Sequence, residues 1–164
     1  MPIQIRKMTD EEFQYFYQLS VAYQAEELMK ERPINREEAL EAATEELAQM
    51  LPNGLHSEHH CLMTIEKTNP KETVGFIWTL HEITDGKKQS FLCDFLILEQ
   101  KRRQGYATAA LKMMEEDAVE AGCQESVLFV ADRNYAAKEL YRKCGYQFLR
   151  QLDHGMYMIK QLIP

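Results

Sequence analysis

The sequence predicts an α/β protein of the α+β type, in which helices lie on both faces of a mixed, predominantly antiparallel sheet. Two helix patterns with capping residues come first, three strand patterns separated by short turn signals follow, and helices and strands alternate afterwards. Strands joined by short turns pair as antiparallel hairpins, whereas a doubly wound nucleotide-binding fold needs repeated strand–helix units. The 164 residues suit one domain, which we predict to span residues 1–164.

The first part of the chain contains one strand and two helices. Residues 3–6 alternate between apolar and polar side chains, which predicts a strand. Thr9 followed by Glu12, and Asn35 followed by Glu38, fit the capping box that begins a helix. A proline follows each helix pattern, and we expect each helix to end before it.

The rest of the chain supplies six strands and two helices. Segments rich in β-branched and aromatic residues are separated by the turn signals 68–70 and Asp85-Gly86. Gly105 and Gly122 enclose a helix with one apolar face, and Gly145 closes a shorter helix. The predicted strands are 61–67, 74–83, 91–98, 126–131, 148–152 and 156–159, and the predicted helices are 105–122 and 135–144.

Charge and hydropathy exclude several classes of protein. A formal net charge of −7 opposes general binding to nucleic acid, because the phosphate backbone would be repelled. No apolar run is long enough to cross a bilayer, and the first residues do not form a secretory signal. We therefore expect a cytoplasmic protein with neither nucleic-acid nor membrane partners.

The cysteines and histidines predict no metal site. The four cysteines are widely separated and form no C-x-x-C pair, which favours free thiols in a reducing compartment. His56, His59 and His60 are close in sequence, but no cysteine or carboxylate pattern completes a zinc site beside them.

The segment from Phe95 to Thr108 has the pattern of a diphosphate site. An apolar strand runs into a basic turn and then into a helix, whose first N–H groups have no intrahelical acceptors. Gly105 lacks a Cβ atom, so a phosphate can approach the main chain closely, and Arg102 and Arg103 add positive charge. The segment lacks the third glycine of G-x-G-x-x-G and the Lys-Ser/Thr of a P-loop.

Two motifs in this chain resemble those of the GNAT superfamily of acetyltransferases. Arg102-x-x-Gly105-x-Ala107 resembles the family's R/Q-x-x-G-x-G/A pattern, and the strand 95–97 precedes it at the family's distance. The segment 51–55 with His59-His60 is similar to an uncharacterised bacterial subgroup. The second motif is Asn134-x-x-Ala137-x-x-Leu140-Tyr141-x-x-Cys144-Gly145-Tyr146, which resembles N-x-x-A-x-x-L-Y-x-x-x-G-F.

The resemblance implies a GNAT-like fold and an N-acetyltransferase that uses acetyl-CoA as co-substrate. The N–H groups of 103–108 would hold the pyrophosphate, and the main chain of 95–97 would pair with the pantetheine amides like an added strand. Asn134 would meet the pantetheine arm, and Tyr141 would stand near the sulfur. The implied coenzyme site comprises Phe95, Leu96, Ile97, Arg102, Arg103, Gln104, Gly105, Tyr106, Ala107, Thr108, Asn134, Ala137 and Tyr141.

Acyl transfer to an amine needs a neutral amine, a donor to the oxyanion and a proton for the leaving thiolate. A tyrosine hydroxyl stays protonated at neutral pH, and the resemblance makes Tyr141 the proton donor, although its helical spacing also fits a core residue. A backbone N–H near Leu96 would be the oxyanion donor if a bulge splays the strand there.

The general base is open. The family often has a glutamate on the strand before the phosphate loop, where this chain has Cys93 and Asp94. Strand alternation sends these two to opposite faces, and Asp94 is the candidate carboxylate. Glu66, His81 and Glu82 lie on neighbouring predicted strands as alternatives.

Three questions stay open at this point. The missing glutamate supports a second hypothesis, a non-catalytic acyl-CoA-binding regulatory domain. The acceptor is a small-molecule or peptide amine of unspecified kind. Family members often pair through their C-terminal strands, and Tyr146, Phe148 and Tyr157 fit either a homodimer or a core.

Overall fold

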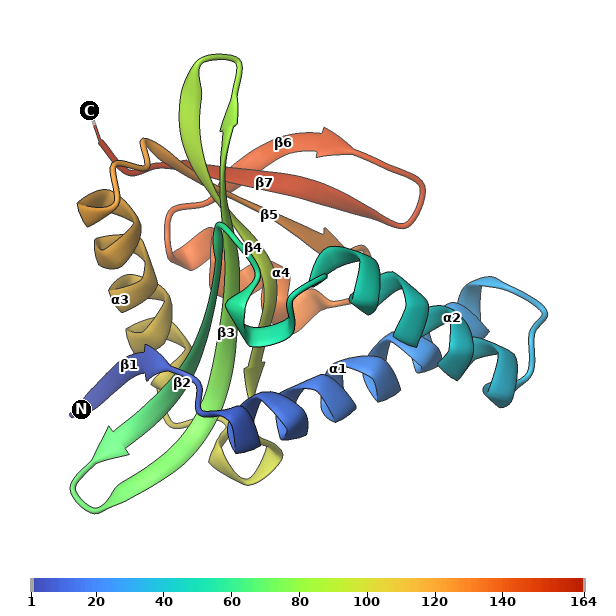
Figure 1. Cartoon of the computed structure of the whole chain (residues 1–164). Helices are drawn as coiled ribbons and strands as arrows, with labels where there is room; N and C mark the ends of the chain where they lie inside the picture. Colours follow the sequence, from blue (N-terminus) through green and yellow to red (C-terminus); the bar gives the residue numbers. More distant parts are fainter. Residues whose placement is uncertain (1, 164) are drawn as a thin grey trace. The chain divides into compact units, whose positions relative to one another are not determined.

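The computed structural model describes residues 2–163 and contains two compact units (Figure 1). One unit joins the residues up to Lys7 with those from Cys61 onward, and the other is Met8–His60. The first unit contains the sheet and both motifs that resemble the GNAT superfamily, so it carries the candidate site.

A seven-stranded sheet has the order β1-β2-β3-β4-β5-β7-β6. The ladders β1–β2, β3–β4, β5–β7 and β6–β7 are antiparallel, and β4–β5 is parallel. The predicted mixed, mainly antiparallel sheet is therefore confirmed. The strands are β1 (Ile3–Lys7), β2 (His60–Thr68), β3 (Lys71–Thr84), β4 (Lys87–Ile97), β5 (Glu125–Ala131), β6 (Gln147–Gln151) and β7 (Gly155–Gln161).

Two helices of this unit, α3 (Tyr106–Glu120) and α4 (Tyr135–Lys143), pack on one face of the sheet. Ala110, Leu111 and Met114 of α3 share a buried cluster with Leu92 and Leu128 from the two parallel strands. The opposite face of the same strands therefore turns away from α3 and α4, because side chains alternate along a strand.

The second unit is a pair of helices, α1 (Asp10–Glu31) and α2 (Arg36–Met50), followed by the 3₁₀ turn η1 (Gly54–His56). Both predicted capping boxes are present: Thr9 and Asn35 each accept a hydrogen bond from the backbone of the N3 glutamate, whose side chain accepts one from the cap residue. Small residues such as Ala25, Ala39 and Ala43 form the buried contact between the helices, so their backbones approach closely.

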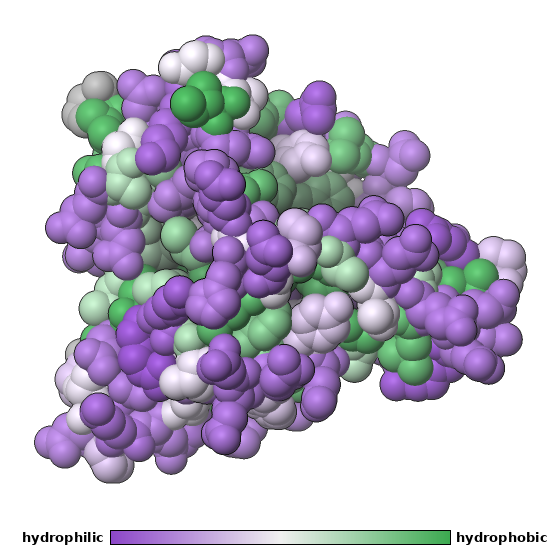
Figure 2. Space-filling model, viewed as in Figure 1, coloured by the Kyte–Doolittle hydropathy of each residue, from purple (hydrophilic) through white to green (hydrophobic). Residues whose placement is uncertain are grey.

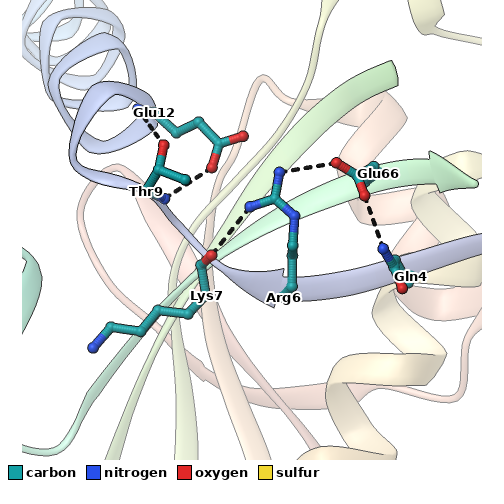
Figure 3. A network of polar contacts seen from close by, with 6 residues as sticks. All are labelled: Gln4, Arg6, Lys7, Thr9, Glu12 and Glu66. Carbon is teal, nitrogen blue, oxygen red and sulfur yellow. Dashed lines mark hydrogen bonds and ion pairs between the residues drawn. The ribbon is translucent and has the colours of Figure 1, made fainter. Parts of the chain in front are cut away.

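The β1–β2 edge of the sheet is held by a buried carboxylate (Figure 3). Glu66 accepts a hydrogen bond from Gln4 Nε2 at 2.8 Å and forms an ion pair with Arg6 Nη2 at 2.9 Å. The Arg6 guanidinium, followed by Gln4, holds the pKa of Glu66 below its usual value. A carboxylate held in this way is a poor proton acceptor, which argues against Glu66 as the base.

Candidate active site

The central feature of the site is an opening between β4 and β5, which diverge after pairing over four residues (Figure 1). The parallel ladder runs from Gln89–Glu125 to Leu92–Leu128 and then stops. Beyond it, β4 continues to Ile97 along β3, and β5 continues to Ala131 along β7. Two strand edges therefore separate within one sheet, and each presents main-chain groups to the space between them.

A β-bulge in β4 lies at the start of this opening. The β3–β4 register pairs Trp78 with Asp94 but Thr79 with Leu92, so Cys93 is the extra residue. The bulge is thus three positions before Leu96, where the sequence analysis placed a conditional one.

The bulge also corrects the expectation that Cys93 and Asp94 point to opposite faces. Leu92 and Phe95 both pack against the α3–α4 core although they are three positions apart, so regular alternation is interrupted between them. The two intervening residues consequently share the other face. Burial, followed by the charges of Asp94 and Glu82, raises the pKa of the Cys93 thiol to about 12.

The main-chain groups of Phe95 and Ile97 point to the opposite side of β4 from those of Leu96. The Leu98 N–H donates to the Val74 carbonyl at 2.9 Å, which fixes every second β4 residue as hydrogen-bonded to β3. The Leu96 main chain therefore faces β3, and those of Phe95 and Ile97 face the opening.

Two of the four groups that face the opening have partners among the described residues. Asp94 Oδ1 accepts from the Phe95 N–H at 2.8 Å, and the Ile97 carbonyl accepts from Arg102 Nε at 2.9 Å. The Phe95 carbonyl and the Ile97 N–H are the remaining acceptor and donor, a pair suited to an amide group lying along the strand.

The loop after β4 turns the chain so that α3 begins beside the opening. It contains an unpredicted 3₁₀ turn, η2 (Glu99–Lys101), and two left-handed residues, Arg103 (φ 64°) and Gly105 (φ 85°). Gly105 is the N-cap of α3 and no side chain caps that end, so the N–H groups of residues 106–108 point outward without intrahelical acceptors. The first main-chain bond of the helix runs from the Ala109 N–H to the Gly105 carbonyl.

The electrostatic environment of this helix start favours an anion. The first turn of α3 contains no acidic residue, and Arg102, Arg103, Gln104, Gly105 and Thr108 are exposed there. The positive end of the helix dipole and the two arginines both attract an anion. The Tyr106 side chain is buried in the core, so only its main chain faces the loop.

The remaining predicted coenzyme residues belong to α4 and its N-cap, and α4 packs into the same core cluster as α3. Asn134 is the N-cap of α4, and its Oδ1 accepts a hydrogen bond from the Ala137 N–H at 3.2 Å. Ala137 packs against the core. The family-implied role of Asn134 toward pantetheine thus adds to a capping role that the structure shows.

Tyr141 is buried, with 8% of its surface exposed, and its ring meets that of Tyr146 edge-on at 5.8 Å. Tyr146 in turn shares a 2.7 Å hydrogen bond with Ser126 Oγ, and burial raises the pKa of the Tyr146 hydroxyl. A rigid aromatic pair therefore fixes the Tyr141 ring. Both the core interpretation and the proton-donor interpretation are compatible with this position.

The other carboxylates and histidines of the sequence analysis are distributed over several places. Glu82, like Asp94, is on the sheet face opposite α3 and α4, while His81 is paired with Ser90 and shares the helix-covered face. Among the described residues 2–163, no group of three or more His, Cys, Asp or Glu side chains is placed to hold a metal ion. No helix within the same range is long and apolar enough to span a membrane.

The fold and the opening define a class: a mixed α/β protein whose parted parallel strands and uncapped helix start suit an extended ligand with a phosphate end. The model of the acetyltransferase (GNAT) family matches residues 14–146. The chain therefore belongs to the GNAT family, and it is an acetyltransferase by family.

Individual relatives agree with this assignment. The uncharacterized N-acetyltransferases YycN and YdgE of Bacillus subtilis are 31% and 32% identical over 147 residues, with 90% and 89% of this chain and 94% and 92% of theirs aligned. The crystal structure of YycN superimposes with a TM-score of 0.85 at 28% identity, over 92% of this chain and 96% of that one.

A more distant solved structure shares the fold. The spermidine N-acetyltransferase of Vibrio cholerae, in complex with CoA and spermine, has a TM-score of 0.73 at 15% identity, over 98% of this chain and 95% of that one.

Proposed function

We propose that this protein transfers an acetyl group from acetyl-CoA to a primary amine by direct attack. The observation that carries the proposal is the opening between β4 and β5 next to the uncapped start of α3. An extended pantetheine chain with a diphosphate at one end matches that combination, because the strand edge offers amide partners and the helix start offers N–H groups.

The proposed binding mode assigns a task to each part of the loop. The main-chain N–H groups of 103–108, with Gly105 at the closest approach, hold the pyrophosphate, and Arg102 and Arg103 supply positive charge. The Phe95 carbonyl and the Ile97 N–H bind a pantetheine amide. The structure of a CoA complex of a distant relative, the PaiA N-acetyltransferase of Thermoplasma acidophilum, supports CoA as the ligand type, with a TM-score of 0.69 at 18% identity, over 98% of this chain and 99% of that one.

In the proposed reaction the amine nitrogen attacks the thioester carbonyl carbon, and the C–S bond breaks as the tetrahedral intermediate collapses. Asp94 accepts the proton that the amine loses, directly or through water. Tyr141 donates its hydroxyl proton to the departing thiolate. A main-chain N–H of β4 near the bulge stabilises the oxyanion.

Three further points belong to the proposal. The family match runs across both compact units, which supports one domain over residues 1–164. The four cysteines are free, in keeping with a reducing cytoplasm. The exposed Phe148 on β6 is compatible with a homodimer, as is its position on the last strand of the sheet.

The proposal is tested by calorimetric titration with acetyl-CoA of the wild type, Gly105→Glu and Gly86→Glu. The first variant places a carboxylate at the proposed pyrophosphate position and should weaken binding by about tenfold or more, since like charges about 4 Å apart at a protein surface repel by about 1–4 kcal/mol. Gly86→Glu is the matched control, because Gly86 also has a positive φ (77°) but lies in a hairpin turn with open space around it.

Binding to the wild type and to Gly86→Glu, with loss in Gly105→Glu, would support the coenzyme site. An amine screen for thiol release then distinguishes an enzyme from the alternative, a non-catalytic acyl-CoA-binding regulatory domain, which would bind acetyl-CoA without turnover. Equal affinity in all three proteins would remove the helix start from the site.

A further inference from the structure

A partly exposed aromatic cluster lies on the sheet face opposite α3 and α4. The Tyr157 ring meets those of Phe91 and Phe129 edge-on, at 6.2 and 5.5 Å between ring centroids. These rings come from β7, β4 and β5, and Phe129 keeps 42% of its surface exposed. Figure 2 shows hydrophobic side chains over the β5–β7 region, bordered by hydrophilic ones. Aromatic rings packed edge-on form a rigid apolar surface, so few side chains lose conformational freedom when a ligand binds there.

A guanidinium group covers one end of this aromatic cluster. Arg150 of β6 lies over the Tyr157 ring, with its Cζ 5.3 Å from the ring centroid. Within residues 2–163, no carboxylate forms an ion pair with Arg150. Arginine positioned on a ring and without an acidic partner is suited to a carboxylate of a ligand.

The register brings this cluster into line with the proposed reaction centre. Phe129 pairs with Tyr157, and Tyr157 pairs with Arg150. Leu92 is level with Leu128, so the next β4 residues, Cys93 and Asp94, are level with Phe129 at the start of the opening. One row across the sheet therefore runs from Asp94 over two aromatic rings to Arg150, all on one face.

Strand spacing gives the length of this row. Adjacent strands are about 4.8 Å apart, so β4 and β6 are about 14 Å apart or more where β4 and β5 diverge. The Arg150 guanidinium lies over Tyr157 of β7, which is one strand nearer to Asp94 than β6 is. Two strand spacings, about 10 Å, separate β7 from β4. An α-amino acid has its amine and carboxylate on one carbon and is too short to reach both ends.

We propose that the acceptor is a primary amine that carries a carboxylate beyond an apolar or aromatic spacer, with the spacer on Phe129 and Tyr157 and the carboxylate on Arg150. This inference rests on the proposed function, because it places the amine at Asp94. Arg150 is a specificity-determining residue in this arrangement and takes no part in proton transfer.

The test compares 4-(2-aminoethyl)benzoate, phenethylamine and spermidine as acceptors for the wild type, Arg150→Gln, Phe129→Ala and Arg142→Gln. Arg142 is the matched control, since it is an exposed arginine paired with Glu139 on α4, which packs on the other face. We expect the wild type to prefer the benzoate over phenethylamine by tenfold or more in kcat/KM. Arg150→Gln should reduce this preference to less than threefold, Phe129→Ala should lower kcat/KM for both aromatic amines, and Arg142→Gln should retain the preference.

Binding provides a readout that does not depend on turnover. Calorimetric titration of the CoA-saturated protein with the two aromatic amines should show the same preference and the same loss in Arg150→Gln. If none of the three acceptors is acetylated, turnover gives no preference to compare, and these affinities alone decide the inference; the proposed function is decided separately, by acetyl-CoA titration and the wider amine screen.

Three results would overturn the inference: a preference for phenethylamine or spermidine, a preference for the benzoate that survives Arg150→Gln, or equal affinity for the two aromatic amines. Sedimentation of the same variants tests whether a second copy of the chain, instead of an acceptor, binds to this face. If Phe129→Ala or Arg150→Gln dissociates a dimer while the acceptor ratio is unchanged, the face is a protein interface and the inference is wrong.

Discussion

Gly75 sits where β3 approaches β4 beside the proposed pantetheine position, and Gly75→Ala is the sharpest test of that position. A Cβ atom at residue 75 would lie 2.2 Å from the Leu96 carbonyl oxygen and 3.1 Å from the Ile97 Cα atom. Both contacts are with main chain, so a side-chain rotation cannot relieve them. The Leu96 carbonyl must move by about 0.8 Å to reach the 3.0 Å below which Cβ contacts are essentially never seen.

This displacement has two calculable effects. Overpacking of a core strand should lower the free energy of unfolding by about 1–3 kcal/mol, which corresponds to a fall of about 2–12 °C in Tm. Displacement of Ile97 should lower kcat/KM by about 100-fold, because a misplacement of about 1 Å has that effect on a positioned reaction. Acetyl-CoA affinity should fall as well, since the Ile97 N–H is one of its proposed partners.

The matched control is Gly155→Ala, which creates an equally close main-chain contact elsewhere. Its Cβ would lie 2.4 Å from the Val130 carbonyl oxygen and 2.5 Å from Phe129 Cζ, on the β5–β7 pair. Because Phe129 belongs to the proposed acceptor site, this control is compared in stability and acetyl-CoA affinity and not in turnover. We expect similar loss of stability in both variants and loss of acetyl-CoA affinity in Gly75→Ala alone, measured by thermal unfolding and calorimetric titration. If Gly75→Ala binds acetyl-CoA as the wild type does, the β4 edge is not the pantetheine site.

Two further predictions concern single side chains. Tyr141→Phe should slow single-turnover acetyl transfer by about 100-fold while acetyl-CoA affinity stays within about twofold, and an unchanged rate would assign the tyrosine to the core alone. Glu66→Gln should lower the free energy of unfolding at pH 7 by about 1–2 kcal/mol, because an ionic hydrogen bond from Arg6 is lost. Since the folded-state pKa of Glu66 is depressed, this stabilisation is present above the unfolded-state value and disappears as pH falls through the folded-state pKa. Urea unfolding of both proteins between pH 7 and pH 3 should show the difference shrinking, and a constant difference would contradict the ion-pair explanation.

Much of the fold was predictable because local signals agreed with tertiary packing. The capping boxes at Thr9 and Asn35 begin helices in the structure, and the Asp85-Gly86 turn joins β3 to β4 with both residues at positive φ. These signals are local: a cap or a tight turn needs only neighbouring residues. The helix start at Gly105 was predictable for the same reason.

The divergence of β4 and β5 could not be predicted in this way, because it depends on register. The bulge at Cys93 is visible only as a shift in the pairing of β4 with β3, and no residue type near Cys93 signals it. This one extra residue changes which side chains share a face, so the alternation rule misplaced Cys93 relative to Asp94.

The partners of Asp94 and Arg102 have a consequence for coenzyme binding. Asp94 Oδ1 accepts a hydrogen bond from the Phe95 N–H, and Arg102 Nε donates one to the Ile97 carbonyl. Each side chain therefore satisfies one main-chain group that faces the opening. The proposed pantetheine contacts use the other two groups, the Phe95 carbonyl and the Ile97 N–H, so acetyl-CoA can bind while Asp94 and Arg102 keep these bonds and remain beside the opening.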